Sequence, residues 1–142
     1  MQHPLTGRVI SIHAVRSAGA VLDVLESHGL LIPNPDSPAI IFHWFSGTSN
    51  ELARARNANC YFSVNERMLA TKRGREYARQ IPLDRLLLET DAPAEANTET
   101  SAQSLIRSLT RTSMRIASLK NCDAKRIESA VLANAHSVFD LR

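Results

Sequence analysis

Three short apolar runs in this chain each lead into a side chain that can bind a metal ion. Residues 9–12 run into His13, residues 39–42 run into His43, and the leucines from 86 to 88 lead through Glu89 to Asp91. Apolar runs of this length without polar alternation are typical of strands in parallel sheets that helices cover. The carboxyl ends of such strands share one rim, so the pattern predicts that His13, His43 and Asp91 converge there.

The segments between these runs predict an α/β fold in which parallel strands alternate with helices. Gly29 is placed to end the first helix in a left-handed conformation, and Thr48 with Glu51 has the spacing of a capping box. The expected strands cover residues 9–12, 39–42, 60–64 and 86–90; the expected helices cover residues 16–28, a segment from about 49, part of 72–81, 102–119 and about 123–136. This order implies about four parallel strands with right-handed crossovers and flanking helices.

Composition adds few constraints on function. The length of 142 residues and the 44% hydrophobic content suit one folded unit, and a net charge of +3 does not by itself indicate a nucleic-acid coat. No apolar run approaches the roughly 20 residues that span a bilayer, and the N-terminus lacks a signal-peptide pattern. We therefore expect a cytoplasmic protein without membrane contact, in which Cys60 and Cys122 are reduced structural thiols.

The three strand ends predict a site for a divalent metal ion. A single histidine is more often a hydrogen-bonded core residue than a ligand, but the repeated placement of His13 and His43 favours ligation. Asp91 would complete the site as a ligand, and it would also take a proton from a water that the metal activates. For Glu89 two roles stay open, namely a catalytic acid and a buried acid that forms an ion pair or caps a loop.

Three strings of residues resemble the last three signatures of the TatD-type metal-dependent deoxyribonucleases, which belong to the amidohydrolase-like superfamily. The strings are Ile12-His13-Ala14-Val15-Arg16, Phe42-His43-Trp44-Phe45-Ser46-Gly47 and Glu89-Thr90-Asp91-Ala92-Pro93. The resemblance implies that the chain is the C-terminal half of a TIM-type (β/α) barrel and a partial hydrolase domain over residues 1–142. It also implies a divalent cation (Mg, Mn or Zn) on His13 and His43, Asp91 as ligand or base, Arg16 as a phosphate contact, and DNA as the substrate.

The family's first half carries an H-x-H pair and a metal-bridging Glu, which this sequence does not contain. The first hypothesis is therefore a TatD-like deoxyribonuclease that cleaves phosphodiester bonds. The second is a catalytically incomplete half-barrel that assembles with a copy of itself or with the complementary barrel half, because open strand edges and an apolar interior need a cover. The third is an amidohydrolase-like enzyme that acts on a small molecule.

Overall fold

Four parallel strands pair in chain order in the computed structural model of this protein, which describes residues 7–93 and 100–139. They are β1 (Val9–His13), β2 (Ala39–His43), β3 (Tyr61–Val64) and β4 (Leu86–Leu88). The register places His13 opposite His43, and His43 opposite Ser63. The predicted parallel sheet is thus confirmed, and the two histidines end neighbouring strands on the same face.

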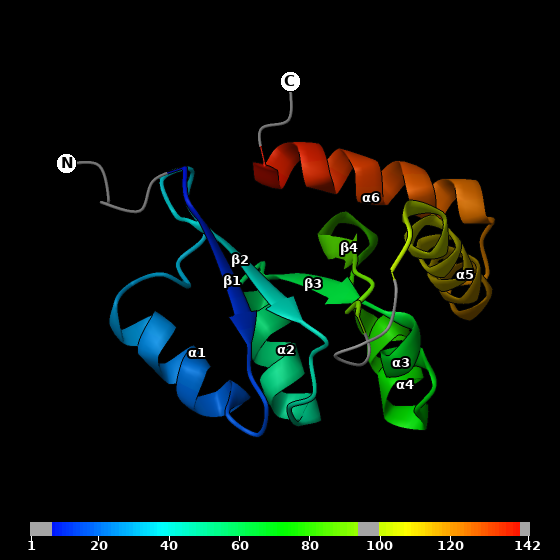
Figure 1. The fold of residues 1–142 in the computed structure, drawn as a ribbon. Coiled ribbons are helices and arrows are strands. Elements are labelled where there is room, and N and C mark those ends of the chain that lie inside the picture. The colour runs from blue at the N-terminus through cyan, green and yellow to red at the C-terminus, as the bar shows by residue number, and fades with distance from the viewer. Residues whose placement is uncertain (1–6, 94–99, 140–142) are drawn as a thin grey trace.

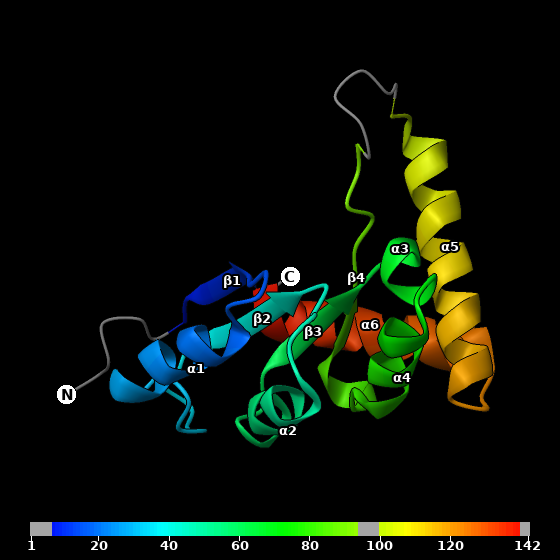
Figure 2. The same cartoon turned by 90° about the horizontal axis from the view of Figure 1, so that it is seen from below.

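Helices pack on both sides of this sheet, with α6 against β4 on the second side. They are α1 (Ala18–Ser27), α2 (Ser49–Asn57), α3 (Glu66–Leu69), α4 (Lys72–Gln80), α5 (Ala102–Leu119) and α6 (Ala124–Phe139), with a 3-10 turn at Leu83–Arg85. In Figure 1, α1, α2 and α4 lie on one side of the strands and α6 crosses the other side. Figure 2, seen from below, shows α5 standing at the β4 end of the sheet. No helix among the described residues is both long and apolar enough to span a membrane.

Two local signals in the sequence act as predicted. The Thr48 hydroxyl accepts a hydrogen bond from the Glu51 amide at 3.2 Å, and the Glu51 carboxylate accepts one from the Thr48 amide at 2.7 Å. This reciprocal capping box satisfies amides that the start of α2 would otherwise leave unpaired. Gly29 follows the end of α1 with a φ of +68°, a conformation that glycine adopts without steric cost.

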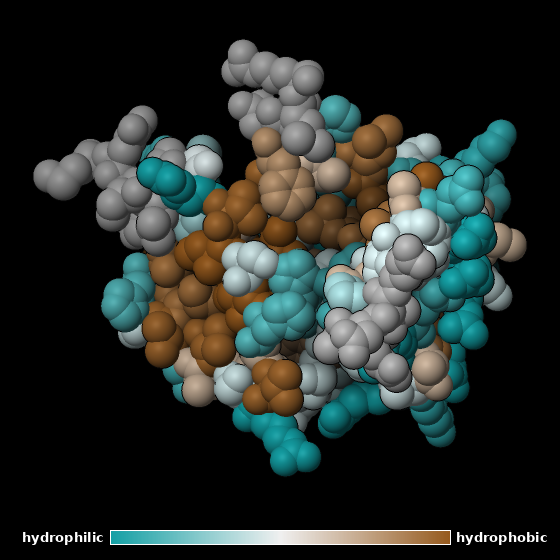
Figure 3. All heavy atoms as spheres, in the orientation of Figure 1, coloured by the Kyte–Doolittle hydropathy of each residue, from teal (hydrophilic) through white to brown (hydrophobic). Residues whose placement is uncertain are grey.

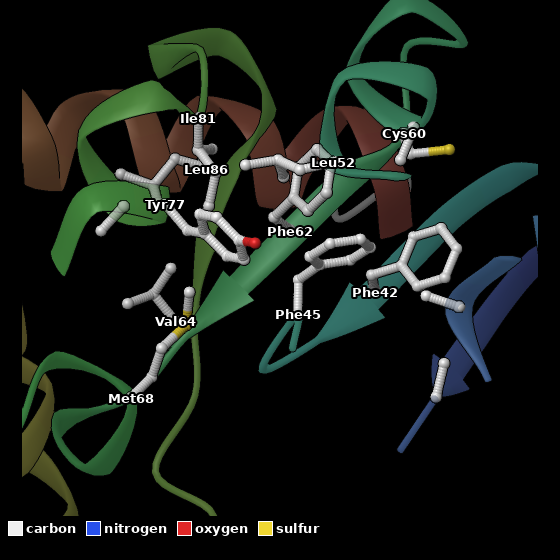
Figure 4. Close-up of a cluster of buried hydrophobic side chains, with 14 of the residues drawn as sticks. Phe42, Phe45, Leu52, Cys60, Phe62, Val64, Met68, Tyr77, Ile81 and Leu86 are labelled. Carbon is white, nitrogen blue, oxygen red and sulfur yellow. The ribbon is translucent and has the colours of Figure 1, made fainter. Parts of the chain in front are cut away.

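The main core lies between the sheet and helices α1 to α4, and it extends to Ile116 and Ala117 of α5 and Ile127 of α6. Its aromatic centre is formed by Phe42, Phe45 and Phe62, whose rings are 5.5 to 6.3 Å apart (Figure 4). Alternate strand residues face the other way, where Ile41 and Leu87 pack with Val138 of α6. Because side chains alternate along a strand, the face that holds Ile41 also carries His43 at its carboxyl end.

Two elements depart most from the sequence prediction, and several other boundaries differ by one to three residues. The strand β4 ends at Leu88, two residues early, although the Glu89 amide still donates to the Val64 carbonyl at 3.0 Å. The region after β3 holds two helices, α3 and α4, where one partly helical connection was expected, because Asn65 acts as a helix cap. The loop expected after Pro93 falls mainly on residues 94–99, outside the described part. Both cysteines are free thiols, as predicted.

Candidate active site

His13 and His43 lie side by side at the carboxyl ends of β1 and β2. Their ring centroids are 5.0 Å apart and their planes differ by 18°. His13 is exposed, whereas the side chain of His43 is 24% exposed. The two imidazoles that the sequence placed at one rim are therefore neighbours in space.

Glu89 is the acid that the structure joins to His43. It follows the last residue of β4, and its side chain is only 13% exposed. One carboxylate oxygen, Oε2, accepts hydrogen bonds from His43 Nδ1 and the Ser63 hydroxyl, and the other, Oε1, accepts one from Asn65 Nδ2 at 2.7 Å. Three donors from β2, β3 and the residue after β3 thus hold this carboxylate, as expected for a buried charge.

The bond to Glu89 determines which nitrogen of His43 carries the proton. A carboxylate only accepts hydrogen bonds, so Nδ1 must be the protonated nitrogen, and Nε2 keeps a lone pair in the neutral ring. Nε2 faces the Ser11 hydroxyl of β1, which donates to it. Histidines that bind metals are commonly oriented in this way, with a carboxylate on the nitrogen that does not bind the ion. The chemistry of His43 therefore fits a metal ligand.

Asn65 is a part of this site that the sequence analysis missed. The residue is fully buried, and its Oδ1 accepts a hydrogen bond from the Met68 amide at 2.8 Å while its Nδ2 holds Glu89. It therefore couples the start of α3 to the acid behind His43. The asparagine followed by Glu66 is a typical helix N-terminus, and this signal could have identified α3.

Asp91 and Arg16 are the other two predicted site residues, and each follows the end of a strand. Asp91 is exposed, has a φ of +54°, and its Oδ2 is 3.4 Å from Nη1 of Arg67. Arg16 is exposed and also has a φ of +54°. Within residues 7–93 and 100–139, no group of three His, Cys, Asp or Glu side chains is close enough to hold a metal ion. The joint coordination by His13, His43 and Asp91 stays a prediction.

The turn after β2 is fixed by packing around Phe45 and Gly47. The Phe45 ring meets Phe42 and Phe62 edge-on, and the Tyr77 hydroxyl donates to the Gly47 carbonyl at 2.7 Å. A Cβ atom on Gly47 would come within 2.9 Å of the Phe45 ring, so this position requires glycine. The anchored turn leaves Trp44 half-buried at the rim with a φ of +40°.

Comparison with known proteins gives one consistent result. Residues 5–140 match the sequence profile of a family described as TatD related DNase. The chain is 42% identical over 82 residues to "Deoxyribonuclease Tat-D" of Schizosaccharomyces pombe, covering 58% of this chain and 25% of that protein. It is 29% identical over 112 residues to "3'-5' ssDNA/RNA exonuclease TatD" of Citrobacter rodentium, covering 73% of this chain and 43% of that protein.

Solved structures agree on the fold. The chain superposes on YJJV, a TatD homolog from Escherichia coli K12, with a TM-score of 0.72 at 22% identity, covering 93% of this chain and 50% of that one. It superposes on a TatD family hydrolase from Entamoeba histolytica with a TM-score of 0.71 at 19% identity, covering 90% and 49%. The chain thus spans half or less of the length of these relatives. These neighbours confirm the predicted fold class, four parallel strands with flanking helices that form part of a TIM-type barrel.

Proposed function

This chain belongs to the TatD family of DNase-related hydrolases, and from that membership we propose that it contributes to metal-dependent cleavage of phosphodiester bonds in nucleic acid. The observation that carries the proposal is the pair of neighbouring imidazoles, one of which is oriented by a buried carboxylate. Two relatives whose names record deoxyribonuclease and ssDNA/RNA exonuclease activity support nucleic acid as the substrate.

His13 and His43 are the residues that would hold a divalent cation. The lone pair on His43 Nε2 becomes available once the Ser11 hydroxyl turns away, and the exposed His13 ring lies beside it. A bound cation would supply a Lewis acid that polarises the phosphodiester and makes water more acidic. Glu89 would keep the His43 ring in place and in the tautomer that ligation requires.

Asp91 and Arg16 would act on the substrate and the attacking water. We propose Asp91 as the group that accepts the proton of that water or adds a ligand, because it follows β4 at the rim where β1 and β2 end. Its carboxylate lies 3.4 Å from Nη1 of Arg67, which keeps it near the rim. Arg16 would contact a phosphate, since it follows His13 by three residues and is exposed.

Metal binding and hydrolysis test this function. Calorimetric titration with Mn²⁺ or Zn²⁺ should show that His43→Ala weakens metal affinity at least about tenfold, in line with the loss expected when a ligand shell is disturbed. His28→Ala is the matched control, because His28 caps the far end of α1 and should leave affinity unchanged. Equal binding by wild type and His43→Ala would make His43 a structural residue and remove the basis of the proposal.

A second candidate function is assembly with a complementary half-barrel. In the described part of the chain, β1 and β4 each have a single neighbour in the sheet, so each offers a free edge. Figure 3 shows apolar side chains gathered over the sheet face that Figure 1 presents. The solved relatives are about twice as long, and the rest of their barrel is the kind of partner that would cover such a face.

Light scattering distinguishes the two candidates. A stable interface buries on the order of 1,200–2,000 Å². If the chain assembles, light scattering should therefore give the mass of a dimer, or the mass of a complex with an added N-terminal half of a TatD-type barrel. Activity should then appear only in that complex. A clean monomer that hydrolyses DNA with added divalent metal would contradict assembly and leave the first candidate in place.

A further inference from the structure

A pocket of about 290 Å³ opens at the rim, and the two histidines form part of its wall. Its lining consists of three rings, two aliphatic side chains and one hydroxyl, from His13, His43, Trp44, Ala14, Val15 and Ser46. The volume is just below the roughly 300–1,000 Å³ of small-ligand sites. Val15 is 77% exposed, so it contributes almost no buried area to folding. The pocket is therefore apolar, close to the proposed chemistry, and formed partly by a side chain that the fold does not need.

Trp44 is held firmly as one wall of this pocket. Its amide donates to the Ser63 carbonyl at 3.1 Å, and the next residue, Phe45, is anchored in the core. The Arg67 guanidinium lies 5.7 Å from the centre of the indole, a cation–π contact, and also approaches Asp91 at 3.4 Å. The indole therefore stands on a turn that packing holds in place. Arg67 lies against the ring, and Asp91, the proposed proton acceptor, lies next to Arg67.

We infer that this pocket binds an unpaired nucleobase, which stacks on Trp44 next to the phosphate that the histidine rim would receive. The inference rests on the proposed function, and it assigns Trp44 and its pocket to the single-strand preference that the name of one relative records. An aromatic ring binds any base through its π face, but a base in a duplex is already stacked and must first be extruded. The Arg67 guanidinium, 5.7 Å from the centre of the indole, would attract the phosphate of a nucleotide bound there.

Intrinsic fluorescence tests the inference directly, because Trp44 is the single tryptophan of the chain. In EDTA, without metal, a short single-stranded oligodeoxynucleotide should quench this fluorescence in a saturable way. An abasic strand of the same length carries the same phosphates without bases, and it should bind roughly 5- to 150-fold more weakly, the range expected for stacking one base, without quenching. A blunt duplex of the same length should behave like the abasic strand.

Two valines provide a matched pair of variants. Val15→Ser changes the pocket wall, whereas Val24→Ser changes a side chain on α1 that is 58% exposed and does not line the pocket. With a labelled oligonucleotide, fluorescence anisotropy should show weaker binding for Val15→Ser and unchanged binding for Val24→Ser. Trp44→Leu should lose the preference for base-bearing over abasic strands, and Trp44→Phe should retain part of it.

Equal affinity for base-bearing and abasic strands would overturn the inference, as would a Trp44→Leu variant that keeps the wild-type preference. Metal-dependent hydrolysis of the same strands separates this failure from failure of the proposed function. Hydrolysis of both strands at equal rates would support the proposed nuclease function and refute the proposed nucleobase pocket. Base-dependent quenching by a chain that hydrolyses neither strand would retain the pocket and refute the nuclease.

Discussion

Asn65 offers the sharpest test of how the site is supported, since one buried amide serves both a helix start and the acid behind His43. Asn65→Ala removes the acceptor that caps α3, which is worth about 1 kcal/mol. It also removes the donor to the Glu89 carboxylate at 2.7 Å, and a hydrogen bond to a charged group is worth about 1.5–3 kcal/mol. We therefore expect the free energy of unfolding to fall by about 2.5–4 kcal/mol, a large fraction of the 5–15 kcal/mol typical of domains.

Asn65→Asp separates these two contributions. Aspartate keeps an acceptor for the Met68 amide, but it places an oxygen where Nδ2 met Glu89 Oε1. At neutral pH two carboxylates would then face each other in a buried site, so the loss should equal or exceed that of Asn65→Ala even though the cap survives. Asn134→Ala is the matched control, since its Nδ2 donates only to the neutral carbonyls of Leu83 and Leu86.

Urea denaturation measures the stability of all three variants, and nitrogen NMR of the imidazoles measures the protonated nitrogen of His43. Wild type and Asn134→Ala should both show protonated Nδ1, because Glu89 stays in place. Both Asn65 variants should shift this signal, since the carboxylate loses one of its three donors. A loss below about 1 kcal/mol in Asn65→Ala, or an unchanged His43 signal in both Asn65 variants, would refute the reasoning.

Two further predictions concern the core and the thiols. Phe62→Ala should lower the free energy of unfolding by about 3–5 kcal/mol, because Phe62 is fully buried on β3. Phe139 is 50% exposed, so Phe139→Ala should change the free energy of unfolding by less than about 0.5 kcal/mol in the same urea melts. A thiol reagent at pH 8 should modify Cys122 in the folded protein and Cys60 only after unfolding, since burial raises the pKa of the Cys60 thiol to about 12. Mass spectrometry counts the labelled thiols, and rapid native labelling of Cys60 would contradict its burial.

The sequence predicted the scaffold better than the connections within the site. Apolar runs located all four strands, and Gly29 and the Thr48 capping box located helix boundaries, because these signals act over a few neighbouring residues. The partners of Glu89 could not be predicted, since they come from β2, β3 and the residue after β3, which only the folded sheet brings together. The pairing of Asp91 with Arg67 was missed for a related reason, because Arg67 lies on α3, a helix that was not expected.

The division of β1 and β2 into two faces has a consequence for how this chain can vary in length. On each strand a core side chain directly precedes a rim histidine, Ile12 before His13 and Phe42 before His43. Deletion or insertion of one residue inside either strand would rotate the histidine into the core between the sheet and helices α1 to α4, and it would turn an apolar group towards the rim. A shift of two residues restores the faces but moves the imidazole by about 6.6 Å along the strand. Length changes that keep the histidines together are therefore confined to the loops between strands and helices.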